Sequence, residues 1–361
     1  MKSVSMNNSK TLKTILTIAI SLFAVFFTHK VLATPVETVN IDVYGTQRLT
    51  RENIIKRYGK EFRELTTYLQ SMNLVGNAKV DAKVDTLFSS LTRQLDDKNN
   101  FAYFRIVNSY HLPENKWYYT IDVVEKKQSE RLTNFSAQPQ KSLSDPDGLL
   151  ASWQEYSKLG WTEFGKTKKT VRHFKCPVTS CLFGFEEPEF KKYKDVFMKG
   201  VVKDKKEIIN VLHNDKDAEN RVAAAYLIGN LTNSADVIKI LKPALHDSTD
   251  RVRSTAMSIL ANAFAQNSNA NFPVKDVVAA LDYPAASERS YAMNLLVSLA
   301  DQPRYLKYVK KHASKQVFAA LQVQEVGMHE AAYNMMKKMS GKTYGERDYT
   351  AWQNWLDAKS V

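Results

Sequence analysis

The sequence predicts a multidomain, mostly helical protein in which an α-solenoid of helical repeats follows a small α+β domain with the order β-α-α-β-β. The first observation behind this fold class is a spaced pattern of polar and apolar residues that occurs four times between residues 221 and 336. The second is a hydrophobic periodicity that changes between strand-like and helix-like from residue 39 to 127. Of the 361 residues, 44% are hydrophobic and 25% are charged, which suits several folded domains and excludes wholesale disorder.

The N-terminus has the pattern of a signal peptide. Three lysines precede an uncharged run from Ile15 to Phe27, and Val31-Leu32-Ala33 supplies small residues before a cleavage site. As a helix this run would reach roughly 20 Å, short of the ~30 Å hydrocarbon core of a bilayer. We therefore predict a signal peptide over residues 1–33, cleaved between Ala33 and Thr34, with export to the periplasm. Secretion and retention as a membrane anchor are the alternatives.

Residues 39–127 predict the α+β domain. Alternating apolar residues from Val39 to Tyr44 predict a strand with one buried face. Apolar residues at three- and four-residue steps then predict two amphipathic helices, at about 50–69 and 78–95. Alternation returns in residues 101–110 and 116–125, which predict two strands joined by a turn.

Three short segments and the order of these elements resemble a POTRA domain over residues 41–127. The segments are Ile41-Asp42-Val43-Tyr44-Gly45, Phe101-Ala102-Tyr103-Phe104 and Asp122-Val123-Val124-Glu125. The resemblance implies that a sheet edge binds extended segments of other proteins. The candidate partner-binding residues are those on the two late strands: Tyr103, Arg105, Trp117 and Tyr119. No β-barrel pattern follows, so no barrel function is implied, and an unrelated small α+β domain is the alternative.

Residues 128–202 predict a connector with a disulfide loop. Ser, Gln and Pro are frequent in residues 128–148, and a short helix is expected at 149–159. Cys176 and Cys181 are the two cysteines of the chain, and in an exported protein this close pair predicts a local disulfide. One alternative is a metal site that includes His173, although His173 is the only neighbouring residue of a metal-ligating type. The other is a redox-active cysteine pair, although the spacing of Cys176 and Cys181 differs from that of such pairs.

The four repeats of residues 203–358 share one pattern. Each repeat begins with a polar residue that is followed after three residues by an Ala and after seven by an Ile, Leu or Met. The first residues are Arg221, Arg253, Arg289 and His329, so successive repeats begin 32, 36 and 40 residues apart. This period fits two helices per repeat. The small residues that let the two helices approach closely are Ala224, Ala256 and Ala292, followed by Ala332 in the last repeat.

These repeats resemble HEAT repeats, in which an acidic residue precedes a Val-Arg pair as Asp250 precedes Val252 and Arg253 here. His329 departs from the Arg of the pattern, and the ending with Trp352 and Trp355 resembles the tail that closes such arrays. The resemblance implies a surface for other macromolecules and no shared catalytic residues. A degenerate last repeat with this tail is expected to act as a cap.

The search for chemistry predicts no enzyme. Common nucleophile, phosphate-loop and zinc-protease motifs are absent from the sequence, and its seven histidines are scattered. We expect no catalytic residue, no metal and no cofactor. An enzyme with a site at 150–200, using His173, Glu186 or Glu187, is the rival class.

The chain carries a formal charge of +13, and two lysine clusters contribute to it. The first cluster covers residues 191–206 and the second covers residues 307–315. We expect them to face acidic proteins, anionic lipid or lipopolysaccharide rather than nucleic acid, because aromatic stacking platforms are missing. Solvated helix faces are the alternative.

Together these observations predict an exported, non-catalytic interaction or scaffold protein of the bacterial cell envelope, whose partners are other envelope proteins. A periplasmic chaperone or assembly factor is the alternative within the binding class.

Overall fold

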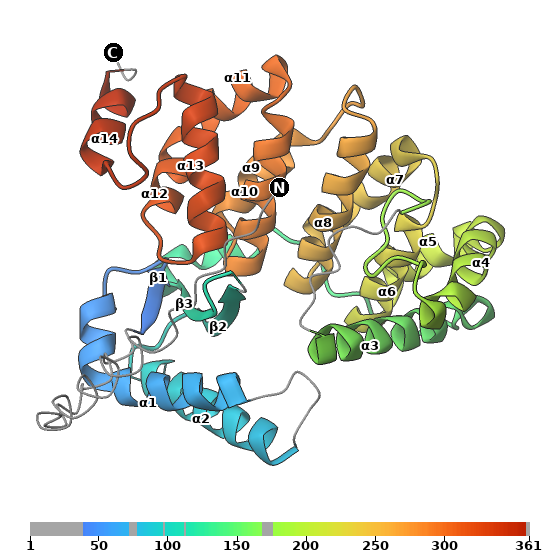
Figure 1. Cartoon of the computed structure of the whole chain (residues 1–361), viewed down its shortest axis with the longest axis horizontal. Coiled ribbons are helices and arrows are strands. Elements are labelled where there is room, and N and C mark those ends of the chain that lie inside the picture. The colour runs from blue at the N-terminus through green and yellow to red at the C-terminus, as the bar shows by residue number, and fades with distance from the viewer. Residues whose placement is uncertain (1–38, 72–77, 97, 112, 168–175, 359–361) are drawn as a thin grey trace, which may run out of the picture. The chain divides into compact units, whose positions relative to one another are not determined.

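A mixed three-stranded sheet and two long helices form the N-terminal part of the protein (Figure 1). The computed structural model describes residues 39–71, 78–96, 98–111, 113–167 and 176–358. The predicted order β-α-α-β-β is confirmed by β1 (Asn40–Tyr44), α1 (Arg51–Ser71), α2 (Ala78–Asp96), β2 (Tyr103–His111) and β3 (Lys116–Val124).

Strand β3 is the centre of the sheet, whose order is β1-β3-β2. It runs parallel to β1 and antiparallel to β2, so that Thr120 is the partner of both Asp42 and Val107. Alternate residues of each strand point to opposite faces. One face packs against α1 and α2 in a hydrophobic core that includes Ile41, Phe62, Leu65, Ile121 and Val123.

The rest of the chain is largely helical. Its α-helices are α3 (Leu149–Thr167), α4 (Pro188–Lys203), α5 (Lys205–Asn214), α6 (Ala218–Gly229), α7 (Ser234–Leu241), α8 (Asp250–Gln266), α9 (Val274–Ala279), α10 (Ala286–Leu299), α11 (Pro303–His312), α12 (Ser314–Leu321), α13 (Val326–Ser340) and α14 (Tyr349–Asp357). Short 3-10 segments lie at Lys126–Leu132, Pro146–Gly148, Lys242–His246 and Ala280–Asp282. Among the described residues, none of the helices combines the length and the apolar character that crossing a bilayer requires.

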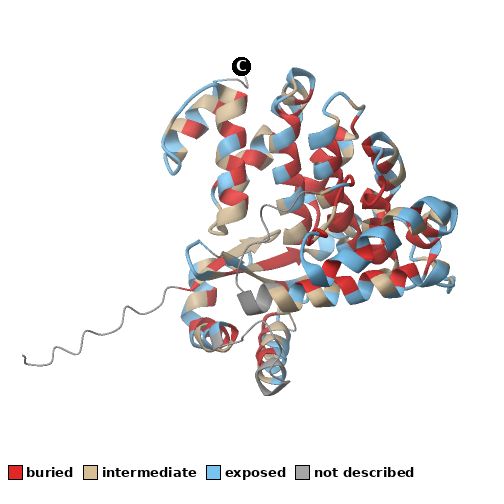
Figure 2. Cartoon of the chain, turned by 45° about the vertical axis from the view of Figure 1, so that its right-hand side comes forward, coloured by how far each residue is buried: buried red, intermediate tan, exposed pale blue. Residues whose placement is uncertain are grey.

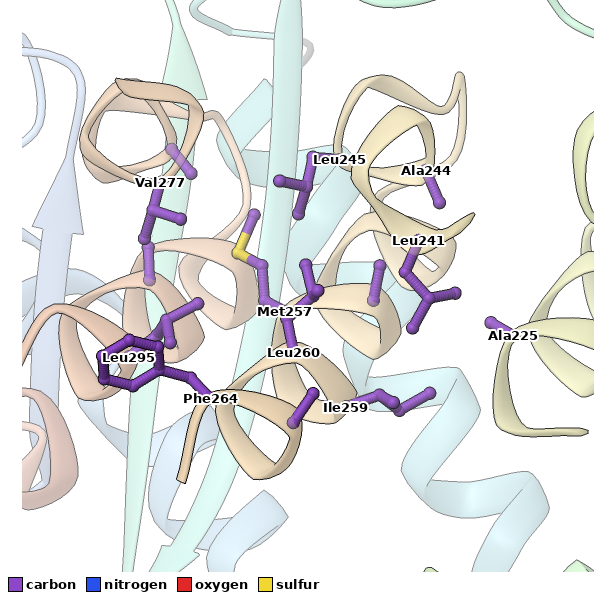
Figure 3. Close-up of a cluster of buried hydrophobic side chains, with 14 of the residues drawn as sticks. Ala225, Leu241, Ala244, Leu245, Met257, Ile259, Leu260, Phe264, Val277 and Leu295 are labelled. Atoms are coloured by element: carbon purple, nitrogen blue, oxygen red, sulfur yellow. The ribbon is translucent and has the colours of Figure 1, made fainter. Parts of the chain in front are cut away.

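The core of the helical part includes α8 and the two helices that pack against it, α6 and α10. Figure 2 shows the buried residues along the helices. Ala224, Ala256 and Ala292 are fully buried on these helices. Figure 3 shows side chains of α8, including Met257 and Phe264, beside those of the neighbouring helices. Small residues at the contacts let the helix backbones approach, and the larger side chains fill the remaining space.

The connector contains one disulfide, between Cys176 and Cys181, as predicted. The backbone N–H groups of Thr179 and Ser180, inside its loop, donate to the carbonyls of Leu231 and Gly229. The loop is therefore held against the end of α6. The predicted helix at 149–159 is present and continues to Thr167 as α3.

Some predictions fall on residues outside the described ranges. The signal peptide, its cleavage site at Ala33 and Thr34, and His173 are among them.

Candidate functional site: the sheet face and the helix N-termini

Four polar residues occupy the same place on four helices. Arg221, Arg253, Arg289 and His329 each lie three residues after the first residue of α6, α8, α10 and α13. All four are buried. These are the residues that begin the sequence pattern, so the pattern marks the first turn of each of these helices.

The three arginines make one repeated set of bonds. Each donates from Nη1 to the carbonyl six residues before it, at 2.8 Å in Arg221, 2.6 Å in Arg253 and 2.9 Å in Arg289. Each also pairs with a carboxylate. Asp247 binds Arg221 at 2.9 and 2.8 Å, and Glu288 binds Arg253, so these two pairs link one helix to the helix pair that follows.

The third arginine takes its carboxylate from the sheet. Asp122 of β3 accepts a hydrogen bond from Nη2 of Arg289 at 2.6 Å and another from the N–H of Ala286 at 2.8 Å. Ala286 is the first residue of α10, and the preceding Ala285 has no side-chain acceptor to cap the helix. Asp122 therefore caps α10 from a strand that lies far away in the sequence, with 0% of its surface exposed.

A second strand residue binds a helix start in the same way. The Asp42 carboxylate of β1 accepts from the N–H groups of Gln324 and Glu325, at 2.8 and 2.9 Å, just before α13 begins. A negative charge is favourable there because it meets the positive end of the helix dipole. Burial nevertheless raises the pKa of Asp42 above its ordinary value, and the two N–H groups oppose that rise.

Tyr44 of β1 contacts two arginines on this side of the sheet. Its ring lies 3.6 Å from the Arg289 guanidinium and 5.4 Å from that of Arg131, and its hydroxyl accepts a bond from Arg131. Burial raises the pKa of Tyr44, so the phenol is neutral at physiological pH. Arg131 also donates to the carbonyl of Asp282, which ties the segment after β3 to the turn before α10.

The other end of this sheet face reaches α8. Arg105 of β2 pairs with Asp250, the first residue of α8. In the sheet, Asp122 is the register partner of both Tyr44 and Arg105. The row across the sheet that contains Asp122 and Arg105 thus contacts the N-terminal ends of α8 and α10. The row that contains Asp42 contacts the start of α13 (Figure 1).

A cleft of about 1330 Å³ lies between this sheet face and helices α10, α12 and α13. Its neutral polar lining includes Gln47, Asn108, Thr120, Gln128, Ser290 and Gln316. Its apolar lining includes Val43, Val107, Leu281, Ala319, Val323 and Met328. Such a lining offers amide and hydroxyl groups between small apolar patches.

The ionisable groups of the cleft are largely engaged by the chain itself. Asp42 binds the start of α13, and Glu325 caps its own helix through the N–H groups of Gly327 and Met328. Arg48 pairs with Glu125, and Arg289 pairs with Asp122. Within the described ranges, no group of three or more His, Cys, Asp or Glu side chains could hold a metal ion. The arrangement is suited to binding by hydrogen bonds and shape.

The predicted partner-binding residues are divided between two faces of the sheet. Tyr119 is only 1% exposed, its ring packs edge-on against Phe62, and its hydroxyl shares a 2.8 Å hydrogen bond with Thr66. Trp117 is half-buried beside Tyr110. Tyr103 and Arg105 lie on the opposite face, where burial raises the pKa of Tyr103. Glu186 and Glu187, which belong to the alternative enzyme hypothesis, are exposed before α4.

Sequence reasoning missed Asp42, Asp122 and Tyr44 as the residues that join the sheet to the helices. A signal for them was present. Two aspartates stand inside strands next to strongly apolar residues, and Ala285 leaves a helix start without a capping side chain.

No protein-family model matches this chain, and no curated protein is significantly similar to it in sequence. The fold and the site therefore define its class: a mostly helical protein with a small mixed sheet at its N-terminal end.

Proposed function

We propose that this chain is an exported, non-catalytic interaction protein of the bacterial cell envelope, and that its cleft binds an extended segment of a partner protein. The observation that carries the proposal is the cleft of about 1330 Å³, whose lining combines amide and hydroxyl groups with charged side chains that mostly bind one another or helix starts. Polypeptide backbone needs such amide and hydroxyl partners when it is removed from water. Within the described ranges, most ionisable groups around the cleft already bind helix starts or each other, which favours binding over acid–base chemistry.

The proposal includes a finer description of the two parts. The helical part is interpreted as a HEAT-type solenoid because Arg221, Arg253 and Arg289 repeat both their place on a helix and their bond to a carbonyl six residues earlier. The N-terminal part is interpreted as POTRA-like on its order β-α-α-β-β. Both interpretations favour macromolecular partners. The predicted signal peptide supports a periplasmic location.

Photo-crosslinking from inside the cleft tests the binding proposal. A benzophenone side chain replaces Ala319, which lines the cleft, and in a matched control it replaces Gln154, which is exposed on α3. Both variants are irradiated in the cell that exports the protein, and the adducts are identified by mass spectrometry. We expect one or a few proteins to crosslink from Ala319 and not from Gln154, through one short segment.

A synthetic peptide of that segment is then measured against the purified protein and against Ser290→Trp, whose indole narrows the cleft. We expect the wild type to bind the peptide and Ser290→Trp to bind it at least tenfold more weakly. Equal crosslinking from both positions, or equal binding by both proteins, would refute the cleft as the partner site.

A further inference from the structure

The structure distinguishes the two lysine clusters of the sequence. Around α4, three lysines are paired with carboxylates: Lys199 lies 3.1 Å from Asp195, Lys205 lies 2.8 Å from Asp236, and Lys203 pairs with Asp147. Further acidic residues stand close in sequence, at Glu186, Glu187, Glu189, Asp204 and Glu207. This cluster is therefore compensated in part by its own carboxylates.

The cluster on α11 is not compensated in this way. Residues 302–324 contain no Asp or Glu, but they contain Arg304, Lys307, Lys310, Lys311 and Lys315. The four lysines are exposed, and among the described residues none of them forms an ion pair with a carboxylate. Arg304 donates to the carbonyls of Asn269 and Ala270.

The positive groups gather on one side of the helix. Arg304, Lys307 and Lys311 follow at three- and four-residue steps, so they share a face of α11. The buried face of the helix carries Tyr305 and Val309 instead. The cationic groups are therefore held outward by the packing of the opposite face.

We propose that the exposed face of α11, with Lys307, Lys310, Lys311 and the nearby Lys315, binds a membrane surface of anionic lipid headgroups. Lysine-rich surfaces attract such headgroups by charge alone and need no pocket. A protein partner fits less well, because protein interfaces are depleted in Lys and enriched in aromatic and Arg residues, while α11 has no exposed large apolar side chain. Nucleic acid fits less well, because the Tyr308 ring already packs beside the His312 ring, with ring centres 4.3 Å apart.

Vesicle binding tests this surface. The protein from Thr34 onward is used, because residues 39–361 form a compact unit by themselves. It is sedimented at low salt with vesicles of phosphatidylcholine alone or mixed with phosphatidylglycerol. We expect binding to the phosphatidylglycerol vesicles only, and we expect it to weaken when salt is raised to about 0.15 M, where charges are screened beyond roughly 8 Å.

A matched pair of variants locates the surface. Lys307→Gln, Lys310→Gln and Lys311→Gln together remove three positive charges from α11, while Lys191→Gln, Lys192→Gln and Lys194→Gln remove three from α4. Each lysine near an anionic surface strengthens binding by about fivefold, so the α11 triple variant should bind about 100-fold more weakly. The α4 triple variant should bind within about threefold of the wild type, and circular dichroism melts check that both are folded.

Three outcomes would overturn the proposal. The first is wild-type protein that stays in solution with both kinds of vesicle. The second is an equal loss in the α4 and α11 variants, which would mean that net charge and not this face controls binding. The third is binding to polyglutamate without binding to vesicles, which would assign the face to acidic polypeptides.

Discussion

The buried pair of Asp122 and Arg289 gives the sharpest prediction about stability. In Asp122→Asn the side chain keeps its shape but loses its charge, so the Arg289 guanidinium, in a residue 5% exposed, has no counter-charge beside it. Its remaining partners are the carbonyls of Tyr283 and Pro284 and the ring of Tyr44. Removing one partner of a buried ion pair costs about 3–5 kcal/mol, and we expect the free energy of unfolding to fall by that amount.

Urea unfolding followed by circular dichroism measures this change. The control is Asp250→Asn, which breaks the more exposed pair with Arg105 and should cost at most about 1 kcal/mol. A double variant, Asp122→Leu with Arg289→Met, removes both charges and should recover much of the loss. A cost for Asp122→Asn no larger than that of Asp250→Asn would refute the reasoning, because it would show that the neutral partners satisfy Arg289.

Three further predictions concern other parts of the chain. Burial raises the folded-state pKa of Asp42 above the ordinary 3.8, so Asp42 holds its proton more tightly in the folded protein than in the unfolded chain. The stability of the wild type relative to Asp42→Asn should therefore fall as pH rises from about 4 through the raised pKa. Urea unfolding at several pH values measures this, and a relative stability that rises with pH would contradict it. Replacing Cys176 and Cys181 by Ser opens a short loop and should lower the free energy of unfolding by about 2 kcal/mol, because the unfolded chain gains loop entropy. If reductant leaves the unfolding of the wild type unchanged, this prediction is wrong. Ala256→Leu should cost at least about 1–3 kcal/mol because the site is fully buried, while the exposed Ala151→Leu should change the melting temperature little.

Local periodicity was sufficient to predict the elements of the N-terminal part. The apolar residues of α1 have the spacing of an amphipathic helix. The apolar residues of each strand alternate with polar ones, so they share the face that packs against α1 and α2. The disulfide between Cys176 and Cys181 followed from the number and spacing of the cysteines. The repeated Ala positions, which were expected at close helix contacts, are buried on α6, α8 and α10.

The contacts of the sheet face could not be predicted from periodicity. The role of Arg105 in binding a partner stays a prediction, and periodicity gave no sign of its ion pair with Asp250 of the same chain. The β3 pattern places Asp122 opposite the apolar face, which by itself suggests a solvated carboxylate. Its burial depends on Ala286 and Arg289, and a contact over 167 residues leaves no trace in local spacing.

The Asp122–Arg289 bond also bears on how this chain can change over evolution. Arg221 and Arg253 find their carboxylates within the helical part, whereas Arg289 depends on a residue of the sheet. Recombination that exchanged the N-terminal part for another domain would leave a positive charge without its counter-ion and would remove the carboxylates that bind the starts of α10 and α13. The two parts are therefore expected to be inherited together. Asp122 and Arg289 are likewise expected to be lost or kept as a pair in related chains.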